Sequence, residues 1–117
     1  MVNFENLKLV ALGNPLLDMQ VRDGQDVLQK YGLKPNDAVL ASPEQLSIYE
    51  HLVENYQVTY VAGGAAQNTA RCAQYALPEG STAYLGCVGN DDLAQQLRAA
   101  NEREGLQLSL IHISERA

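Results

Sequence analysis

Residues 58–68 of the chain, Val-Thr-Tyr-Val-Ala-Gly-Gly-Ala-Ala-Gln-Asn, decide the fold class. The first five are β-branched, aromatic or small, which is typical of a strand. Gly63 and Gly64 end that strand, and a run of small residues that predicts a helix follows them. A strand that passes through a glycine turn into a helix is the repeating unit of α/β folds.

The same alternation extends along the rest of the chain. Residues 8–12 form a short apolar run, which predicts a strand buried on both faces of a parallel sheet. Further strands are expected at 19–22, 38–41 and 82–89, and a helix at 25–31 ends at Gly32. The pattern predicts an α/β fold with a mostly parallel sheet and flanking helices. The two early strands, 19–22 and 38–41, are expected to form a small separate sheet.

Three further helices carry start signals and apolar stripes. Ser42, Pro43 and Gln45 form a predicted capping box, and the stripe that follows is Leu46, Tyr49, Val53 and Tyr56. The helix after Gly64 has the predicted inner stripe Ala66, Ala70, Ala73 and Leu77. Asp91 is expected to cap a last helix, with the stripe Leu93, Leu97 and Ala100 and an end at Gly105.

Composition bounds the function classes. The chain has 117 residues and a net charge of −6, which fits one globular domain and argues against a nucleic-acid partner. No apolar run is long enough to span a membrane, so a soluble, cytoplasmic protein is expected. Cys72 and Cys87 are expected to stay reduced, with Cys87 buried as a structural thiol. His51 and His112 are isolated, so no metal site is expected.

The run Gly13-Asn14-Pro15-Leu16-Leu17-Asp18 follows the first predicted strand. Ligands of open α/β sheets bind beyond the carboxyl ends of the strands, which is where this run would lie. The Asp18 carboxylate can accept hydrogen bonds from two adjacent hydroxyls, which suits the cis-diol of a ribose, and Asn14 adds donors and acceptors. The residue pattern supports equally well a plain turn with a solvated acid.

The turn at 62–68 is a second candidate. Glycines 63 and 64 would let a ligand approach the backbone, and Asn68, one turn into the helix, could reach the same ligand. Free amides at the helix start favour an oxygen-rich ligand. A tight turn with no ligand explains the spacing equally well, and the turn lacks the P-loop pattern. A third cluster, residues 86–91, ends a predicted strand and caps a predicted helix, and these structural roles explain it adequately.

Taken together, these runs and Leu33-Lys34-Pro35-Asn36-Asp37 resemble the adenosine kinase branch of the ribokinase-like (PfkB) carbohydrate kinase family, from about residue 7 to about residue 107. The double glycine with its following asparagine is shared across the superfamily. The Gly13–Asp18 run and Gln67 are similar to the adenosine kinase branch. The resemblance implies a ribokinase-like domain whose lid lies at about 16–61.

The resemblance also implies roles. Members of this branch transfer the γ-phosphate of ATP to the 5′-hydroxyl of adenosine with Mg²⁺, in purine salvage, as monomers in the cytoplasm and also the nucleus. Asp18 matches the ribose-diol ligand, and Asn14 and Asn68 match polar contacts to the nucleoside. Gly63 and Gly64 match the backbone that contacts the ribose, and Leu16 and Leu40 match the lining of the adenine pocket. Ala65 stands where relatives often carry a polar residue.

Members of the family are several times longer than this chain. Their catalytic aspartate and ATP site lie downstream, so no catalytic residue is expected here and the isolated chain is expected to be inactive. Residues 108–117 have no counterpart in the family, which suggests an incomplete copy with a foreign tail. Two alternatives stay open, namely a sugar kinase of the same family and a non-catalytic nucleoside-binding fragment.

Overall fold

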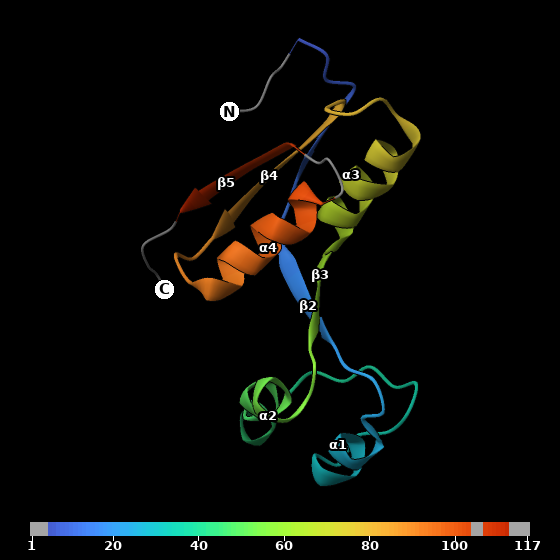
Figure 1. Cartoon of the computed structure of the whole chain (residues 1–117), viewed down its shortest axis with the longest axis vertical. Helices are drawn as coiled ribbons and strands as arrows, with labels where there is room; N and C mark the ends of the chain where they lie inside the picture. The colour runs from blue at the N-terminus through green and yellow to red at the C-terminus, as the bar shows by residue number, and fades with distance from the viewer. Residues whose placement is uncertain (1–4, 104–106, 113–117) are drawn as a thin grey trace. The chain divides into compact units, whose positions relative to one another are not determined.

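The computed structural model describes residues 5–103 and the backbone of residues 107–112. Along the chain the elements are β1 (Leu9–Leu12), β2 (Leu16–Gln20), α1 (Gln25–Lys30), a 3-10 turn η1 (Pro43–Gln45), α2 (Ile48–Asn55), β3 (Thr59–Gly63), α3 (Ala65–Ala76), β4 (Thr82–Val88), α4 (Asp92–Glu102) and β5 (Gln107–His112) (Figure 1). They divide into two compact units, Met1–Asp18 with Tyr60–Ala117, and Met19–Thr59.

The larger unit is built on a parallel sheet, as the sequence predicts. The strand order is β1-β4-β5, and both pairs are parallel. Leu9 of β1 pairs with Thr82 of β4, and Leu12 pairs with Leu85. A second sheet joins β2 to β3. Parallel pairing with helical connections confirms the α/β fold class.

Helices α3 and α4 supply the core of this unit, and Figure 1 shows both beside the sheet. Tyr84, fully buried in β4, packs with Ala70 of α3, and Leu9 and Ala11 of β1 lie against this pair. A second cluster joins Ala62, Leu97 and Ala100, with Leu17 and Val88 packed against it. The small residues of α3 allow the helix to lie close to the strands, which sets the width of the core.

The opposite face of β1 is exposed, so the prediction that this strand is buried on both faces is wrong. Val10 is 51% exposed and Leu12 is 76% exposed, whereas Leu9 and Ala11 face α3. Successive side chains of a strand point to opposite faces, and among the described residues α3 covers only one of the two. Apolarity alone could not show which face had a covering helix.

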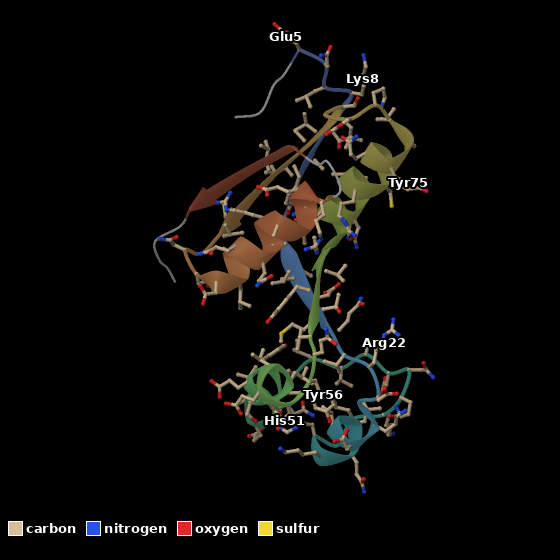
Figure 2. All side chains as sticks on the ribbon, viewed as in Figure 1. Glu5, Lys8, Arg22, His51, Tyr56 and Tyr75 are labelled. Carbon is tan, nitrogen blue, oxygen red and sulfur yellow. The ribbon has the colours of Figure 1, made fainter. Side chains whose placement is uncertain are left out.

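In the smaller unit, Val27 of α1 and Leu52 of α2 are buried. The Tyr56 hydroxyl donates to the Asp26 carboxylate, 2.6 Å from either oxygen. Tyr56 lies close to His51 in Figure 2, and their ring centroids are 6.1 Å apart. These contacts tie the end of α2 to the start of α1.

Three predictions for this region are corrected. Residues 38–41 form no strand, because no described strand pairs with them and all four side chains are exposed. The strand expected at 19–22 lies at Leu16–Gln20 instead. The predicted stripe is half exposed at Tyr49 and Val53 of α2, because the buried residue of this helix is Leu52, and at Leu46, which lies before α2 begins.

The helix signals are confirmed at three ends. Ser42 and Gln45 form the predicted capping box, although it begins η1 and α2 follows only at Ile48. Gly32 has a φ of +65° just after α1, and the Asp91 carboxylate accepts a 2.8 Å hydrogen bond from the Ala94 amide. Leu93, expected to face inward on α4, is 52% exposed and is a further correction.

The predicted end at Gly105 lies outside the described residues. Across the described part of the chain, every helix is too short or too polar to cross a membrane.

Candidate functional site

The turn after β1 brings the first predicted run to the end of the sheet. The Gly13 amide donates to the Leu85 carbonyl at 3.2 Å, and the Gly13 carbonyl accepts from the Tyr84 hydroxyl at 2.7 Å. Both polar groups of the Gly13 backbone are therefore held by β4. Asn14 follows with an exposed side chain, so its amide is accessible to a ligand.

Gly64, between β3 and α3, packs against the backbone of this turn. Its φ of +94° is in the left-handed region, which side chains disfavour. A Cβ at this position would lie 2.8 Å from the Asn14 carbonyl oxygen, so only glycine fits. The Gly64 carbonyl accepts the first helical hydrogen bond of α3, from the Asn68 amide at 2.8 Å. The backbone of the double glycine is thus packed directly on the backbone of the first run.

The Asp18 carboxylate lies over Gly63. A Cβ on Gly63 would be 2.6 Å from Oδ2 and 3.1 Å from Oδ1 of Asp18. Gly63 itself is buried and Asp18 is exposed, so the carboxylate covers the glycine while remaining open to solvent. The two predicted runs therefore converge on one place, with two carboxylate oxygens and a glycine backbone side by side.

Asn68 lies one turn into α3, and Arg71 fixes its side chain. Arg71 Nη1 donates to Asn68 Oδ1 at 3.1 Å and also to the Ala62 carbonyl. Because the amide oxygen faces the guanidinium, Asn68 presents its NH₂ group as a donor on the exposed side. The sequence predicted Asn68 but gave no role to Arg71, although it lies three residues along the same helix.

The two predicted apolar contacts belong to different units. Leu16 is 55% exposed at the start of β2, and its Cγ lies 3.5 Å from the position that a Cβ on Gly64 would take. Leu40, in the smaller unit, is 98% exposed. Leu16 therefore borders the glycine turn, and the expected role of both leucines in lining an adenine pocket stays a prediction.

A cleft of about 260 Å³ lies on the other face of β2. Its lining is Pro15, Leu17, Cys87, Val88, Gly89, Asp91, Leu93, Ala94 and Leu97. Leu17 and Asp18 are successive strand residues, so their side chains point to opposite faces. The cleft is therefore separate from the carboxylate that covers Gly63.

Cys87 is exposed, so the prediction of a buried structural thiol is wrong. It lies between Gly86, which is buried on the face that meets Tyr84, and Val88, and the period of two turns its thiol away. Cys72 is likewise exposed, and both thiols are free. Burial raises the pKa of the neighbouring Tyr84 phenol, with the charge of Cys87 a smaller cause.

Gln67 is the feature that sequence reasoning missed. The sequence marks it only as a point of resemblance to the family, yet its side chain is fully buried. Its amide donates to the Gly63 carbonyl at 2.6 Å and to the Leu16 carbonyl at 3.2 Å. A polar residue at the start of a helix of alanines, directly after a glycine turn, was the available signal.

No group of three or more His, Cys, Asp and Glu residues in the described part of the chain could hold a metal ion. The resemblance implies Mg²⁺ and ATP at sites outside this chain, and that expectation stays a prediction.

Residues 26–117 match the family model of the pfkB family carbohydrate kinases. The chain is 64% identical over 99 residues to an adenosine kinase of Schizophyllum commune, covering 85% of this chain and 29% of that protein. It is 52% identical over 99 residues to an adenosine kinase of Schizosaccharomyces pombe, covering 85% of this chain and 28% of that protein. The chain thus spans less than a third of the length of these relatives.

Solved structures give the same result. The apo adenosine kinase of Trypanosoma brucei brucei matches with a TM-score of 0.82 and 33% identity, over 93% of this chain and 34% of that one. An adenosine kinase of Schistosoma mansoni in complex with adenosine and AMP matches with a TM-score of 0.75 and 29% identity, over 92% of this chain and 32% of that one.

Proposed function

Because the chain belongs to the pfkB family of carbohydrate kinases, we propose that it is the nucleoside-binding part of an adenosine kinase. The reaction of the whole enzyme would transfer the γ-phosphate of ATP to the 5′-hydroxyl of adenosine, giving AMP. One observation carries the proposed recognition of a ribose, namely the Asp18 carboxylate over the Gly63 backbone. Its two oxygens can each accept a hydrogen bond from one of two adjacent ribose hydroxyls.

The neighbouring groups would complete the recognition of the ribose. Asn68 presents NH₂ donors, which suit a hydroxyl or ring oxygen, because its own oxygen is held by Arg71. Gly63 and Gly64 lack side chains, so a sugar can approach their backbone closely. Asn14 is an exposed amide on the adjoining turn. Leu16 and Leu40 would contact the adenine base.

Binding and phosphoryl transfer make different demands. Transfer requires charges that stabilise the moving phosphoryl group, chiefly Mg²⁺ and cationic donors, and a base for the attacking hydroxyl. The polar groups near Gly63 are a carboxylate, amides and the Arg71 guanidinium, which donates to Asn68 and to the Ala62 carbonyl. The carboxylate and the amides suit hydroxyls, and the carboxylate repels a phosphate. The chain is therefore proposed to hold adenosine, with ATP and Mg²⁺ bound by residues beyond it. Purine salvage by a cytoplasmic monomer is the wider role proposed.

Calorimetry on the 117-residue chain tests the binding proposal. We expect heat of binding with adenosine, weaker or no binding with ribose and fructose, and no AMP from adenosine with ATP and Mg²⁺. Asp18→Asn is the matched variant, since it keeps the shape and removes the charge; it should weaken adenosine binding at least tenfold, because hydrogen bonds to a charged acceptor contribute about 1.5–3 kcal/mol. Equal binding by both proteins would refute the role of Asp18.

A chimera tests the reaction. Residues 7–107 would replace the corresponding segment of the Schizophyllum commune adenosine kinase, which is 64% identical over the matched region. AMP formation from adenosine, without phosphorylation of ribose or fructose, would support the proposal. Phosphorylation of a sugar in place of adenosine would identify a sugar kinase. Adenosine binding by a chimera that transfers no phosphate would favour the non-catalytic alternative.

A further inference from the structure

The buried side chain of Gln67 joins the two strands that carry Asp18 and Gly63. It is fully buried near the start of α3, and its amide nitrogen donates to carbonyls of β2 and β3. The β3 acceptor is Gly63, the residue beneath the Asp18 carboxylate. The β2 acceptor is Leu16, two residues before Asp18 on the same strand. Gln67 thus connects β2, which carries the Asp18 side chain, to β3, which carries the Gly63 backbone beneath it.

The orientation of this amide is fixed by its partners. Both backbone groups in front of Gln67 Nε2 are acceptors, so the NH₂ group must face them and the oxygen must face away. Asn101 of α4 supplies the donor that this oxygen needs, with its Nδ2 at 2.8 Å from Gln67 Oε1. The same nitrogen donates to the Leu97 carbonyl at 3.1 Å, which fixes the Asn101 amide in turn. The network has one hydrogen-bonding arrangement.

The cost of burying two amides indicates that this network does more than fill space in the core. Gln67 and Asn101 are both 0% exposed, and buried amides are unfavourable unless they are hydrogen-bonded. Asn101 Oδ1 is buried without a hydrogen-bond partner among the described residues, a penalty that an apolar side chain at this place would avoid. Helix packing alone would be served by apolar residues at both positions.

We infer that Gln67, supported by Asn101, is a positioning residue that holds Asp18 over Gly63 for a ribose diol. This inference rests on the proposed function for its ligand, although the geometry that Gln67 maintains can be measured without any ligand. With both strands attached to one amide, the carboxylate and the glycine backbone keep a constant spacing. A pre-set spacing lets both hydroxyls be bound without first ordering the strand.

The test compares Gln67→Met with the wild-type 117-residue chain. Methionine keeps the length and apolar bulk and removes both donors and the acceptor. Thr69→Ala is the matched control, because Thr69 lies on the same helix, is exposed, and makes only a local 2.9 Å hydrogen bond to the Ala65 carbonyl. Adenosine and 2′-deoxyadenosine serve as the two probes, since the second lacks one hydroxyl of the diol.

We expect Gln67→Met to lower the preference for adenosine over 2′-deoxyadenosine about tenfold, because the diol contact is lost while the base contacts remain. Thr69→Ala should keep the wild-type preference. Loss of stability alone would weaken both ligands equally, so an unchanged preference in a folded Gln67→Met chain would overturn the inference.

A ligand-free measurement separates this inference from the proposed function. Proton NMR should show cross-peaks between the Asp18 β-protons and the Gly63 α-protons in the wild-type chain and in Thr69→Ala. The same cross-peaks should be lost in Gln67→Met, and their persistence would overturn the positioning role. Absence of adenosine binding by the wild-type chain would refute the proposed function and leave this result standing.

If Gln67→Met fails to fold, hydrogen exchange of the Gln67 side-chain amide in the wild-type chain tests the inference instead. The Gln67 NH₂ protons should exchange slowly with solvent and show cross-peaks to Gly63. Rapid exchange, as for an exposed glutamine, would overturn the inference.

Discussion

The hydroxyl of Tyr84 donates a 2.7 Å hydrogen bond to the carbonyl oxygen of Gly13, which ties the interior of β4 to the turn after β1. Tyr84→Phe keeps the ring in the core and removes this bond. We expect a loss of about 1 kcal/mol in the free energy of unfolding, because the carbonyl loses its donor. The urea midpoint should fall with an unchanged slope.

Tyr75→Phe is the control for Tyr84→Phe, since Tyr75 is 96% exposed and its hydroxyl is free to bond water (Figure 2). This variant should unfold at the wild-type midpoint. If Tyr84→Phe did the same, the hydrogen bond to Gly13 would contribute nothing to stability.

Gly63→Ala should displace the Asp18 carboxylate, because the added Cβ would lie 2.6 Å from Oδ2. A displaced carboxylate should lose a hydrogen bond to the ligand, which contributes about 1.5–3 kcal/mol, so the proposed adenosine affinity should fall about tenfold or more. Calorimetry measures the loss. Gly24→Ala is the control in the smaller unit, where the nearest atom to the added Cβ, Val21 Cγ2, is 3.3 Å away. Wild-type affinity in Gly63→Ala would contradict the close approach.

Arg71→Met should weaken the proposed adenosine binding about fivefold, the contribution of one hydrogen bond. The reason is that Asn68 loses the partner that directs its NH₂ group outward. Calorimetry provides the measurement. Arg98→Met is the control for net charge, because it also removes one positive charge but lies on α4, whereas Asn68 lies on α3. An equal effect of the two variants would mean that Arg71 acts through charge alone.

Tyr56→Phe should make the melting temperature of the chain less sensitive to acid. The hydrogen bond from Tyr56 lowers the pKa of Asp26 below its usual 3.8, so the bond stabilises the fold above that pH and is lost as the pH falls through the lowered value. The same bond raises the pKa of Tyr56 above 10.0, so its contribution is also lost at strongly alkaline pH. Melting curves from pH 2 to pH 7, on the order of one unit apart, measure the difference.

In that series, wild type and Tyr56→Phe should differ near neutrality and converge at the acid end. A constant difference across the series would show that the Asp26–Tyr56 bond does not titrate with the fold.

Leu12→Thr should leave the stability of the chain unchanged. Leu12 is 76% exposed on the face of β1 away from α3, so its removal changes the free energy of unfolding by less than about 0.5 kcal/mol. Urea unfolding should give the wild-type midpoint. Ala11→Thr, one residue earlier, places extra atoms and a hydroxyl against α3 and should destabilise the chain instead. The reverse order would contradict the assignment of the two faces.

Local signals predicted the elements well where the chain itself supplies the contacts. The capping box at Ser42 and the carboxylate cap at Asp91 involve residues three apart, so the sequence shows both partners. The strand expected at 38–41 failed because a strand depends on a distant partner, and no described strand pairs with it. The apolar stripe on α2 failed for the same reason, since spacing shows that a face exists but not what covers it.

The sequence predicted the residues of the candidate site that would contact a ligand, but not the buried residues that hold them in place. Asp18 and Gly63 have residue types that suggest chemistry, and the rule that strand ends meet at one edge brought them together. The structure shows that they are in contact although they lie 45 residues apart along the chain. Gln67 and Asn101 were missed as supports because a polar residue in a helix is usually exposed, and only packing reveals a buried one.

The contact between Gly13 and α3 has a consequence for how this chain can vary. A Cβ on Gly13 would lie 2.7 Å from the Cβ of Ala66, so the two positions together have room for one methyl group. A larger residue at either position alone crowds the contact between α3 and the turn after β1, whereas Gly13→Ala combined with Ala66→Gly conserves the volume. Any redesign of this protein therefore has to choose the two residues together, because a library that randomises them independently will contain many combinations too large for the shared space.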